Sequence, residues 1–349
     1  MKVKLREEFY RDKDKIIEEL NQNKEVEYAE PNYIYYAIGA EPVTDVMSEE
    51  EARNWVEENY GDNTEGPVTP NDPLYSSQSN IKAINADDVW QTTKGDTTSV
   101  IAILDTGVDT EHPDLKDNIW TNHKENSGTD DYDDDENGYK DDRHGWDFIN
   151  NDNDPKDDNM HGTHVAGIAA AVGDNEIGIA GASWYAKIMP VKVLQASGRG
   201  DAGIISQGIE YAYQNGATIL NMSFGGYAES QTMSRAAENA YAYATLVAAA
   251  GNDGICIGPG PLCARMFPAA WTYVIGVEAG TDWSNYDQDG PTFSRWLNQE
   301  NYEVKAPGTA IMSTVPNGGY RALSGTSMSS PLVAGAVALY NNQKPTDSK

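Results

Sequence analysis

The stretch 99-SVIAILDTGV-108 decides the fold of this chain. It is a continuous apolar run, rich in Ile and Val, that ends with a single acidic residue, Asp105. A strand covered on both faces has this composition, because neither of its sides meets water. Four more runs of the same kind follow: KIMPVKVL (187–194), ATILNMSFGG (217–226), TLVAAAGN (245–252) and TYVIGVEA (272–279).

Helical patterns rich in small residues lie between these runs: HVAGIAAAVG (164–173), AGIISQGIEYAYQNG (202–216) and SRAAENAYAYA (234–244). Apolar strands that alternate with helices predict an α/β fold, with a mostly parallel central sheet flanked by helices in three layers. In such sheets, reactive side chains gather at the carboxyl ends of the strands. The residues that follow each apolar run are therefore the candidates for a functional site.

The composition excludes several classes of function. The 349 residues carry 25 basic against 55 acidic side chains, a formal charge of −30. Such a surface repels phosphates, so we expect no nucleic-acid partner. No apolar run reaches the roughly 18 residues that a membrane span needs, so we expect no membrane partner. Cationic partners, metal ions among them, suit this charge better.

The chain divides into three regions by composition. Residues 1–38 are rich in Lys, Glu and Tyr and predict a short helix near Asp12–Asn21, followed by a strand-like VEYAEPNYIYYA (26–37). Residues 39–68 are acidic and poor in apolar side chains, which indicates a linker with at most one exposed helix, Ser48–Glu58. Residues 69–349 form the main domain. The N-terminus has no apolar segment of the kind found in signal peptides.

Two cysteines, Cys256 and Cys263, flank the segment CIGPGPLC. A Gly- and Pro-rich turn between them can bring the two sulfur atoms within disulfide distance, which is the interpretation we favour. Free thiols are the next alternative. A metal site is the third, and it would need two further ligands from elsewhere.

Asp105, in ILDTGV, is the first candidate for chemistry. The Asp-Thr-Gly motif also occurs in aspartic proteases, but their mechanism needs two carboxylates that share a proton. This chain has one such motif and no second copy. Taken alone, the motif is also compatible with an aspartate that caps a turn.

Three further segments place polar side chains at helix starts or strand ends. His161 and His164, in MHGTHVAGIAAAVG, suit a metal site or a structural role on a tightly packed helix. Ser327, in LSGTSMSSPLVAGAVALY, stands at a helix N-terminus, which favours a developing anion, but serine is also a common cap. Asn252, in VAAAGNDG, is a donor for such an anion or an ordinary turn residue.

Together the segments DTG, HGTHVAG, AAAGN and SGTSMSSP, in that order, resemble the subtilisin-like serine proteases, the subtilases. The resemblance spans residues 71–339 and implies a subtilisin-like fold that hydrolyses peptide bonds in polypeptide substrates. It implies that Ser327 attacks the scissile carbonyl, His161 carries the proton, and Asp105 orients the imidazole. Asn252 and the backbone N–H of Ser327 would form the oxyanion hole.

The same resemblance assigns substrate-binding residues. The segments LQASGRG and MSFGG resemble the two strands between which family members hold an extended peptide, and AAAGN resembles one wall of the first specificity pocket. The residues implied are Gly198, Arg199, Gly200, Ser223, Phe224, Gly225, Ala249, Ala250 and Gly251. The opposite pocket wall falls in the divergent stretch 255–267.

Calcium is the expected cofactor, with a structural role. The insertion GTDDYDDDENGYKDDRHGWDF holds seven aspartates between Asp130 and Asp142, a density of like charge that favours a bound cation. A solvated acidic loop is the alternative. The spacing within the insertion indicates Asp133, Asp135, Asn137 and Asp141 as ligands. Family resemblance implies a separate site, called the first calcium site below, made by Asp72, Asp114, Asn175 and the backbone oxygens of Ile177 and Ile179.

Both ends of the chain depart from the family pattern. VEYAEPNYIYY resembles the last strand of the inhibitory propeptide of subtilases, so the segment is expected to dock on the catalytic domain and to be cut between Tyr36 and Asn71. The C-terminal end is shorter than is usual in the family. The resemblance also implies a secreted zymogen, and we expect a monomer. A catalytically inactive, calcium-binding homologue is the alternative function.

Overall fold

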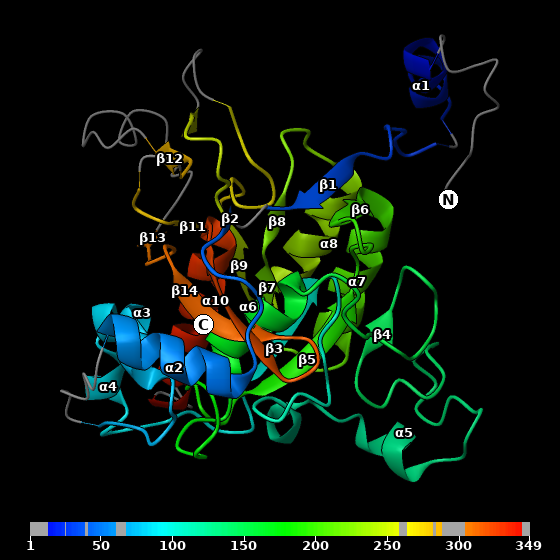
Figure 1. Cartoon of the computed structure of the whole chain (residues 1–349). Helices are drawn as coiled ribbons and strands as arrows, with labels where there is room; N and C mark the ends of the chain where they lie inside the picture. Colours follow the sequence, from blue (N-terminus) through cyan, green and yellow to red (C-terminus); the bar gives the residue numbers. More distant parts are fainter. Residues whose placement is uncertain are drawn as a thin grey trace.

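A parallel sheet forms the centre of the molecule (Figure 1). The computed structural model describes residues 13–24, 26–38, 41–60, 68–257, 264–281, 284–287 and 304–343. The seven strands have the order β13-β11-β9-β7-β3-β5-β4, and all neighbours are parallel. They are β3 (Val100–Asp105), β4 (Trp146–Asp147), β5 (Lys187–Lys192), β7 (Ile219–Met222), β9 (Thr245–Ala249), β11 (Ile275–Glu278) and β13 (Val304–Lys305). The predicted three-layer α/β fold is confirmed.

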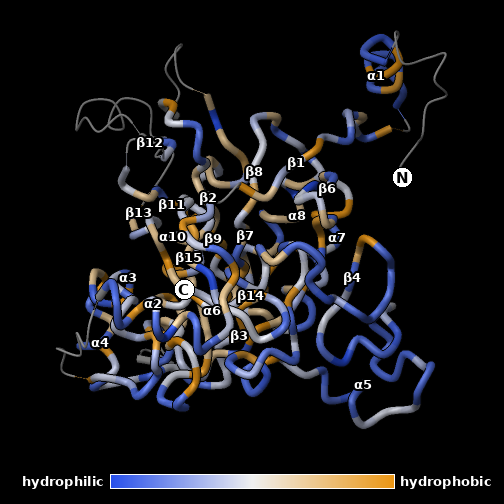
Figure 2. The backbone as a smooth tube through the Cα atoms, in the orientation of Figure 1, coloured by the Kyte–Doolittle hydropathy of each residue, from blue (hydrophilic) through white to orange (hydrophobic). Residues whose placement is uncertain are grey.

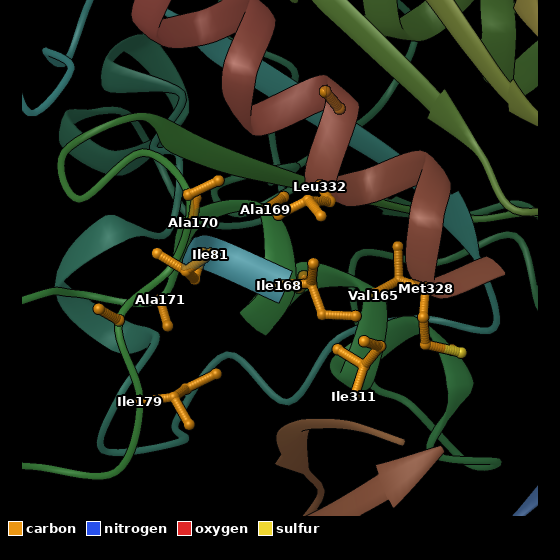
Figure 3. Close-up of a cluster of buried hydrophobic side chains, with 14 of the residues drawn as sticks. Ile81, Val165, Ile168, Ala169, Ala170, Ala171, Ile179, Ile311, Met328 and Leu332 are labelled. Atoms are coloured by element: carbon orange, nitrogen blue, oxygen red, sulfur yellow. The ribbon is translucent and has the colours of Figure 1, made fainter. Parts of the chain in front are cut away.

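Two hydrophobic cores cover the two faces of this sheet. Ile101 and Ile103 of β3 face α6 (His161–Ala170) and α10 (Thr326–Gln343). The alternate residues Ala102 and Leu104 face α7 (Ala202–Gln214) and α8 (Gln231–Tyr241), because successive side chains of a strand point to opposite faces. Figure 3 shows the first core, where Val165 and Ile168 of α6 lie beside Met328 and Leu332 of α10.

Shorter elements surround the sheet. They are η2 (Tyr75–Ser77), α3 (Ser79–Ala83), α4 (Ala86–Val89), η3 (Lys116–Asn118), α5 (His123–Ser127), the pair β10 (Cys256–Ile257) and β12 (Tyr286–Asp287), and the hairpin of β14 (Ile311–Val315) with β15 (Gly319–Ser324). The loop around α5 is hydrophilic along most of its length (Figure 2), as its acidic sequence predicts.

The N-terminal region has a helix and a strand, as its sequence predicts. Helix α1 (Lys13–Asn21) buries none of its side chains and lies apart from the main body (Figure 1). Strand β1 (Ile34–Ala37) runs antiparallel between β6 (Arg199–Asp201) and β8 (Phe224–Gly225). Residues more than 160 positions apart in sequence therefore form one small sheet.

The prediction that residues 48–58 are at most an exposed helix is wrong. Helix α2 (Glu49–Tyr60) buries Ala52 and Val56 in the core that contains α6 and α10. These residues are four positions apart and so lie on one face, while the acidic side chains that dominate the composition cover the other face. The preceding strand β2 (Glu41–Pro42) pairs with β15, so residues 41–60 are packed on the main domain.

Two sequence predictions concern regions that the structure covers only in part. Cys263 lies outside the described residues, so the disulfide with Cys256 stays a prediction. Within the described part of the chain, no helix has both the length and the apolar character needed to cross a lipid bilayer.

Candidate active site

Asp105 and His161 meet at the carboxyl edge of the sheet. Asp105 is the last residue of β3 and is fully buried, and His161 is the first residue of α6. The Nδ1 atom of His161 donates a hydrogen bond of 2.8 Å to Oδ1 of Asp105. Burial lowers the pKa of His161, but the charge of Asp105 and this hydrogen bond outweigh it, so the pKa lies above its ordinary value. The pair can hold and release a proton.

A glycine allows this close approach. A Cβ atom on Gly162 would overlap the carbonyl oxygen of Gly107 and would lie 3.1 Å from the Cβ of Asp105. Any larger residue at position 162 would therefore push α6 away from the end of β3. The small-residue pattern after His161 has this structural reason.

Ser327 stands in the first turn of α10, with its side chain buried. Its hydroxyl donates to the carbonyl oxygen of Ile38 at 2.8 Å and to that of Ser223 at 3.2 Å. The Nε2 atom of His161 is buried and has no hydrogen-bond partner among the residues that the structure describes, and the Ile38 carbonyl also helps to raise the pKa of His161. Both side chains therefore lie beside the carbonyl group of Ile38, directly after the segment held between β6 and β8.

Asn252 is held in one orientation by its neighbour Thr326. Its Oδ1 accepts from the backbone N–H of Thr326 at 2.9 Å and from the Thr326 hydroxyl at 3.0 Å. Both bonds use the oxygen of the amide. The Nδ2 group, which is the hydrogen-bond donor of this side chain, therefore points away from Thr326. This geometry suits a donor for a developing oxyanion.

The predicted substrate-binding residues line strand β1. Tyr35 and Tyr36 pair with Gly200 and Arg199, and Ala37 pairs with Phe224. The N–H of Ala37 donates to Gly198 at 2.7 Å, and that of Ile38 donates to Ser223 at 3.2 Å. The chain's own residues 34–38 thus occupy the position between two strands that the sequence predicts for a bound peptide.

Two side chains of this segment are inserted into the protein. The Tyr35 ring is fully buried, meets Phe224 edge-on with ring centroids 6.5 Å apart, and donates from its hydroxyl to Ala228 at 2.6 Å. The side chain of Ile38 lies beside Gly225, next to Met266. Met266 belongs to the stretch in which we expected the second pocket wall, and Ala249, Ala250 and Gly251 are buried close to Thr326 and Asn285.

The first set of predicted calcium ligands comes together. Asp72 lies beside the loop that follows α6, and Asp114 accepts from Asn175 Nδ2 at 3.1 Å and from the Ile179 N–H at 2.9 Å. Burial raises the pKa of Asp72 to about 6 and that of Asp114 well above its ordinary range, and the negative charge of Asp72 raises the pKa of Asp114 further. The Oδ1 atom of Asp72 is buried and has no hydrogen-bond partner in the described part of the chain. Buried carboxylates of this kind would hold a cation such as calcium, whose charge would offset theirs.

The acidic insertion is organised differently from our prediction. Asp135 groups with two residues that sequence reasoning missed, Glu125 and Asp142, and one carboxylate oxygen from each lies within 4.8 Å of the others. Asp133 instead accepts from the backbone of Asn137 and Gly138, a local turn. The structure therefore does not group Asp133 with this carboxylate cluster.

Asp141 and Asn137 also have other partners. Asp141 accepts from Arg143 at 3.2 Å and from the N–H of Asp131 at 2.8 Å. Asn137 uses its Nδ2 atom as a donor to Asp135 and Asp142. The predicted set of four ligands is thus reduced to Asp135, with Asn137 as a neighbour. Spacing in the sequence could not identify Glu125 as a ligand, because this residue lies ten positions before Asp135, in a separate helix, α5.

A buried Asp–His pair, a serine at a helix start that donates to the carbonyl of an extended segment, and a side-chain amide bonded to the same helix start are the arrangement typical of serine peptidases. The comparison with known proteins agrees. The model of the subtilase family matches residues 96–349. The chain belongs to the subtilase family and is a serine endopeptidase.

Three relatives illustrate the similarity. A thermophilic serine proteinase of Bacillus sp. (strain AK1) is 35% identical over 338 residues, which cover 94% of this chain and 66% of that protein. Thermitase of Thermoactinomyces vulgaris is 37% identical over 277 residues, with coverage of 79% and 86%. An intracellular serine protease of Paenibacillus polymyxa is 38% identical over 263 residues, with coverage of 74% and 71%.

Proposed function

We propose that the chain is a calcium-stabilised endopeptidase whose nucleophile is Ser327 and whose general base is His161, oriented by Asp105. Ser327 Oγ adds to the carbonyl carbon of the substrate while His161 Nε2 takes its proton. The same proton is then returned to the leaving amine, which breaks the C–N bond and leaves an acyl-enzyme that water hydrolyses. Nδ2 of Asn252 and the Ser327 N–H stabilise the oxyanion in both steps.

One observation carries this proposal: the hydroxyl of Ser327 donates to the carbonyl of Ile38, at the end of a strand held between β6 and β8. A peptide held in this register presents the bond after Ile38 to the nucleophile. We therefore propose that Ile38–Gly39 is the first bond that the enzyme cuts. Residues 1–38 then correspond to the inhibitory propeptide of a zymogen. The family resemblance also favours a secreted monomer.

Contacts outside the cleft support the docking of this segment. Both carboxylate oxygens of Glu30 accept hydrogen bonds at the N-terminus of α8, from the N–H groups of Gln231 and Thr232 at 2.7 and 2.9 Å. Asn32 accepts from the N–H of Gly203, in the first turn of α7, at 3.1 Å. Acceptors at helix N-termini satisfy free N–H groups and complement the helix dipole.

Processing is the direct test of the proposed register. Wild-type protein, incubated with calcium and sampled over time, is expected to yield a fragment that ends in Ile38 and a new N-terminus at Gly39. Intact-mass measurement and N-terminal sequencing identify both ends. A new N-terminus at another position would contradict the register, and an active enzyme that never loses residues 1–38 would contradict the zymogen role.

Tyr35 is expected to dominate the affinity of the docked segment. A synthetic peptide of residues 30–38 should inhibit the processed enzyme. Replacing Tyr35 by alanine should weaken that inhibition by about 100-fold or more, because a buried aromatic side chain contributes roughly 3 kcal/mol or more. Tyr36 is the matched control: its side chain is 48% exposed and contacts Arg199, so alanine there should cost less than tenfold. Equal effects at both positions would contradict the role of the Tyr35 pocket.

Asn252 gives a test of the oxyanion hole. Asn252→Asp keeps the oxygen that accepts from Thr326 but replaces the Nδ2 donor. We expect turnover to fall by about 10²–10³ with KM little changed, the size of loss that subtilisin shows without its own asparagine donor. Steady-state kinetics on a chromogenic peptide measure both constants. A loss confined to KM would show that Asn252 binds the ground state and does not stabilise the transition state.

We also propose that the protein binds calcium at two sites. The first site would use Asp72, Asp114, Asn175 and backbone oxygens of Ile177 and Ile179, and the second Glu125, Asp135 and Asp142. The support for the first site is the pair of buried carboxylates, with one Asp72 oxygen that lacks a partner. The support for the second is the convergence of three carboxylates, two of them fully buried. Calcium at these positions stabilises the fold and takes no part in bond cleavage.

A further inference from the structure

A buried carboxylate that the proposed mechanism does not use lies just before α6. Asp157 is 5% exposed and accepts hydrogen bonds through both oxygens. The donors are Thr106 Oγ1 (2.9 Å), Asn159 N (2.9 Å), Met160 N (2.9 Å), Thr163 N (2.9 Å) and Thr163 Oγ1 (2.7 Å). We infer that Asp157 is a positioning residue, which fixes the first turn of α6 so that the His161 ring meets Asp105. This inference rests on the proposed role of His161 as general base.

The first part of the argument is the connection to Asp105. The Thr106 hydroxyl donates to Asp157 and accepts from the N–H of Gly162 at 3.0 Å. The N–H of Thr106 in turn donates to Oδ1 of Asp105 at 2.7 Å, the same oxygen that accepts from His161. Asp157 is thus bonded to both sides of the Asp–His pair, the end of β3 and the start of α6.

The second part is the backbone conformation of Met160, directly before His161. Its φ angle is +113°, a region that side-chain-bearing residues rarely adopt. Such a conformation persists only where its surroundings determine it. The N–H of Met160 is bound by Oδ1 of Asp157, and that of His161 by Asn159, which Asp157 also holds. Without the carboxylate, the turn that sets the direction of the His161 side chain loses its anchor.

The third part is charge. Burial lowers the pKa of His161, the charge of Asp105 opposes this most strongly, and the charge of Asp157 adds to the rise. The other charged or titratable groups around this turn are His164, one turn along α6, Arg321 of β15, whose carbonyl oxygen contacts His164, and Lys192 of β5. Lys192 is bound by Asp158 and by the carbonyl oxygen of Thr106. Removing the charge of Asp157 should therefore make the imidazolium less favourable.

Asp157→Asn tests the inference in the processed enzyme. We expect kcat to fall by about 10- to 100-fold with KM within about twofold, because a small misplacement of a catalytic group has effects of this size. The acid limb of the kcat/KM profile should move to lower pH by on the order of half a unit, since a weaker negative field lowers the pKa of His161. Asp154→Asn is the matched control. It removes the same charge from an exposed position in the same loop and should match the wild type.

A second pair of variants keeps the test informative if Asp157→Asn does not fold. Thr106→Val removes the bridging hydroxyl and keeps the carboxylate, so kcat should fall about tenfold or more while the acid limb stays in place. Thr106→Ser restores the hydroxyl and should recover most of the rate. Wild-type kinetics and a stoichiometric fluorophosphonate label are measured in parallel. If the wild type does not react, the proposed function fails.

If the wild type reacts but Asp157→Asn keeps its rate and its acid limb, the positioning role alone is overturned. The variant could also lose rate only because fewer of its active sites bind the label. If that lost fraction accounts for the whole rate loss and the acid limb does not move, the positioning role is likewise overturned. That result would make Asp157 a residue that only stabilises the fold.

Discussion

Replacing Ser327 by alanine is expected to lower turnover by about 10⁶-fold, the loss that subtilisin shows when its own serine or histidine is removed. The same variant should keep residues 1–38 attached, because the bond after Ile38 is cut by the same hydroxyl. The physical reason is that the Ser327 hydroxyl is the group that contacts the Ile38 carbonyl and would form the acyl-enzyme. Peptide hydrolysis and intact mass report the two effects independently.

Ser329→Ala is the matched control for this variant. Ser329 is buried in the same turn of α10, and none of the described residues forms a hydrogen bond with its hydroxyl, so its removal should leave processing and turnover close to the wild type. His161→Ala should match Ser327→Ala, and the double variant should be no worse, because the two residues act as a unit. Substantial activity in folded Ser327→Ala would contradict the assignment of the nucleophile.

Removal of calcium is expected to produce the second large effect. A ligand that binds only the native state adds about 2.7 kcal/mol at a hundredfold excess over its Kd, so two ions together contribute on the order of 5 kcal/mol. Chelation should lower the melting temperature by on the order of 10 °C. The Ser327→Ala background is the right one for this measurement, since an inactive protein cannot digest itself as it unfolds.

Single ligand variants separate the two calcium sites. Asp114→Asn should remove the part of the calcium effect that belongs to the first site, and Glu125→Gln the part that belongs to the second. Asp117→Asn is the control, because it removes the same charge from an exposed position three residues from Asp114. A melting temperature that does not respond to calcium or chelator would contradict both sites.

Much of the fold and of the candidate site follows from the sequence. The apolar run ending in Asp105 predicted β3 of the central sheet, and the motifs predicted Asp105, His161 and Ser327, which the structure brings to the same edge of that sheet. Periodicity and motif spacing are local properties, and here they coincide with the elements that hold the side chains. The register of β1 could not be predicted in this way, since nothing local in IYYAIGAEP shows which carbonyl will meet Ser327.

The predictions were wrong where contacts between distant parts of the chain determine the structure. The helix predicted at residues 48–58 was expected to be exposed, yet Ala52 and Val56 on one face suffice to pack it when a core lies beneath them. Glu125 joins the acidic insertion from a separate helix, which no spacing rule detects. Asp157 and Asp158 are adjacent in sequence, and only the fold directs the first inward to α6 and the second to Lys192.

The most direct test of the central claim is to find where a fluorophosphonate reacts. The folded, processed wild-type protein is labelled in calcium, digested and analysed by mass spectrometry. We predict a single adduct, on Ser327, and none on the Ser327→Ala variant. A folded protein that takes up no label, or that carries it on another residue, would contradict the proposed nucleophile and favour a catalytically inactive homologue.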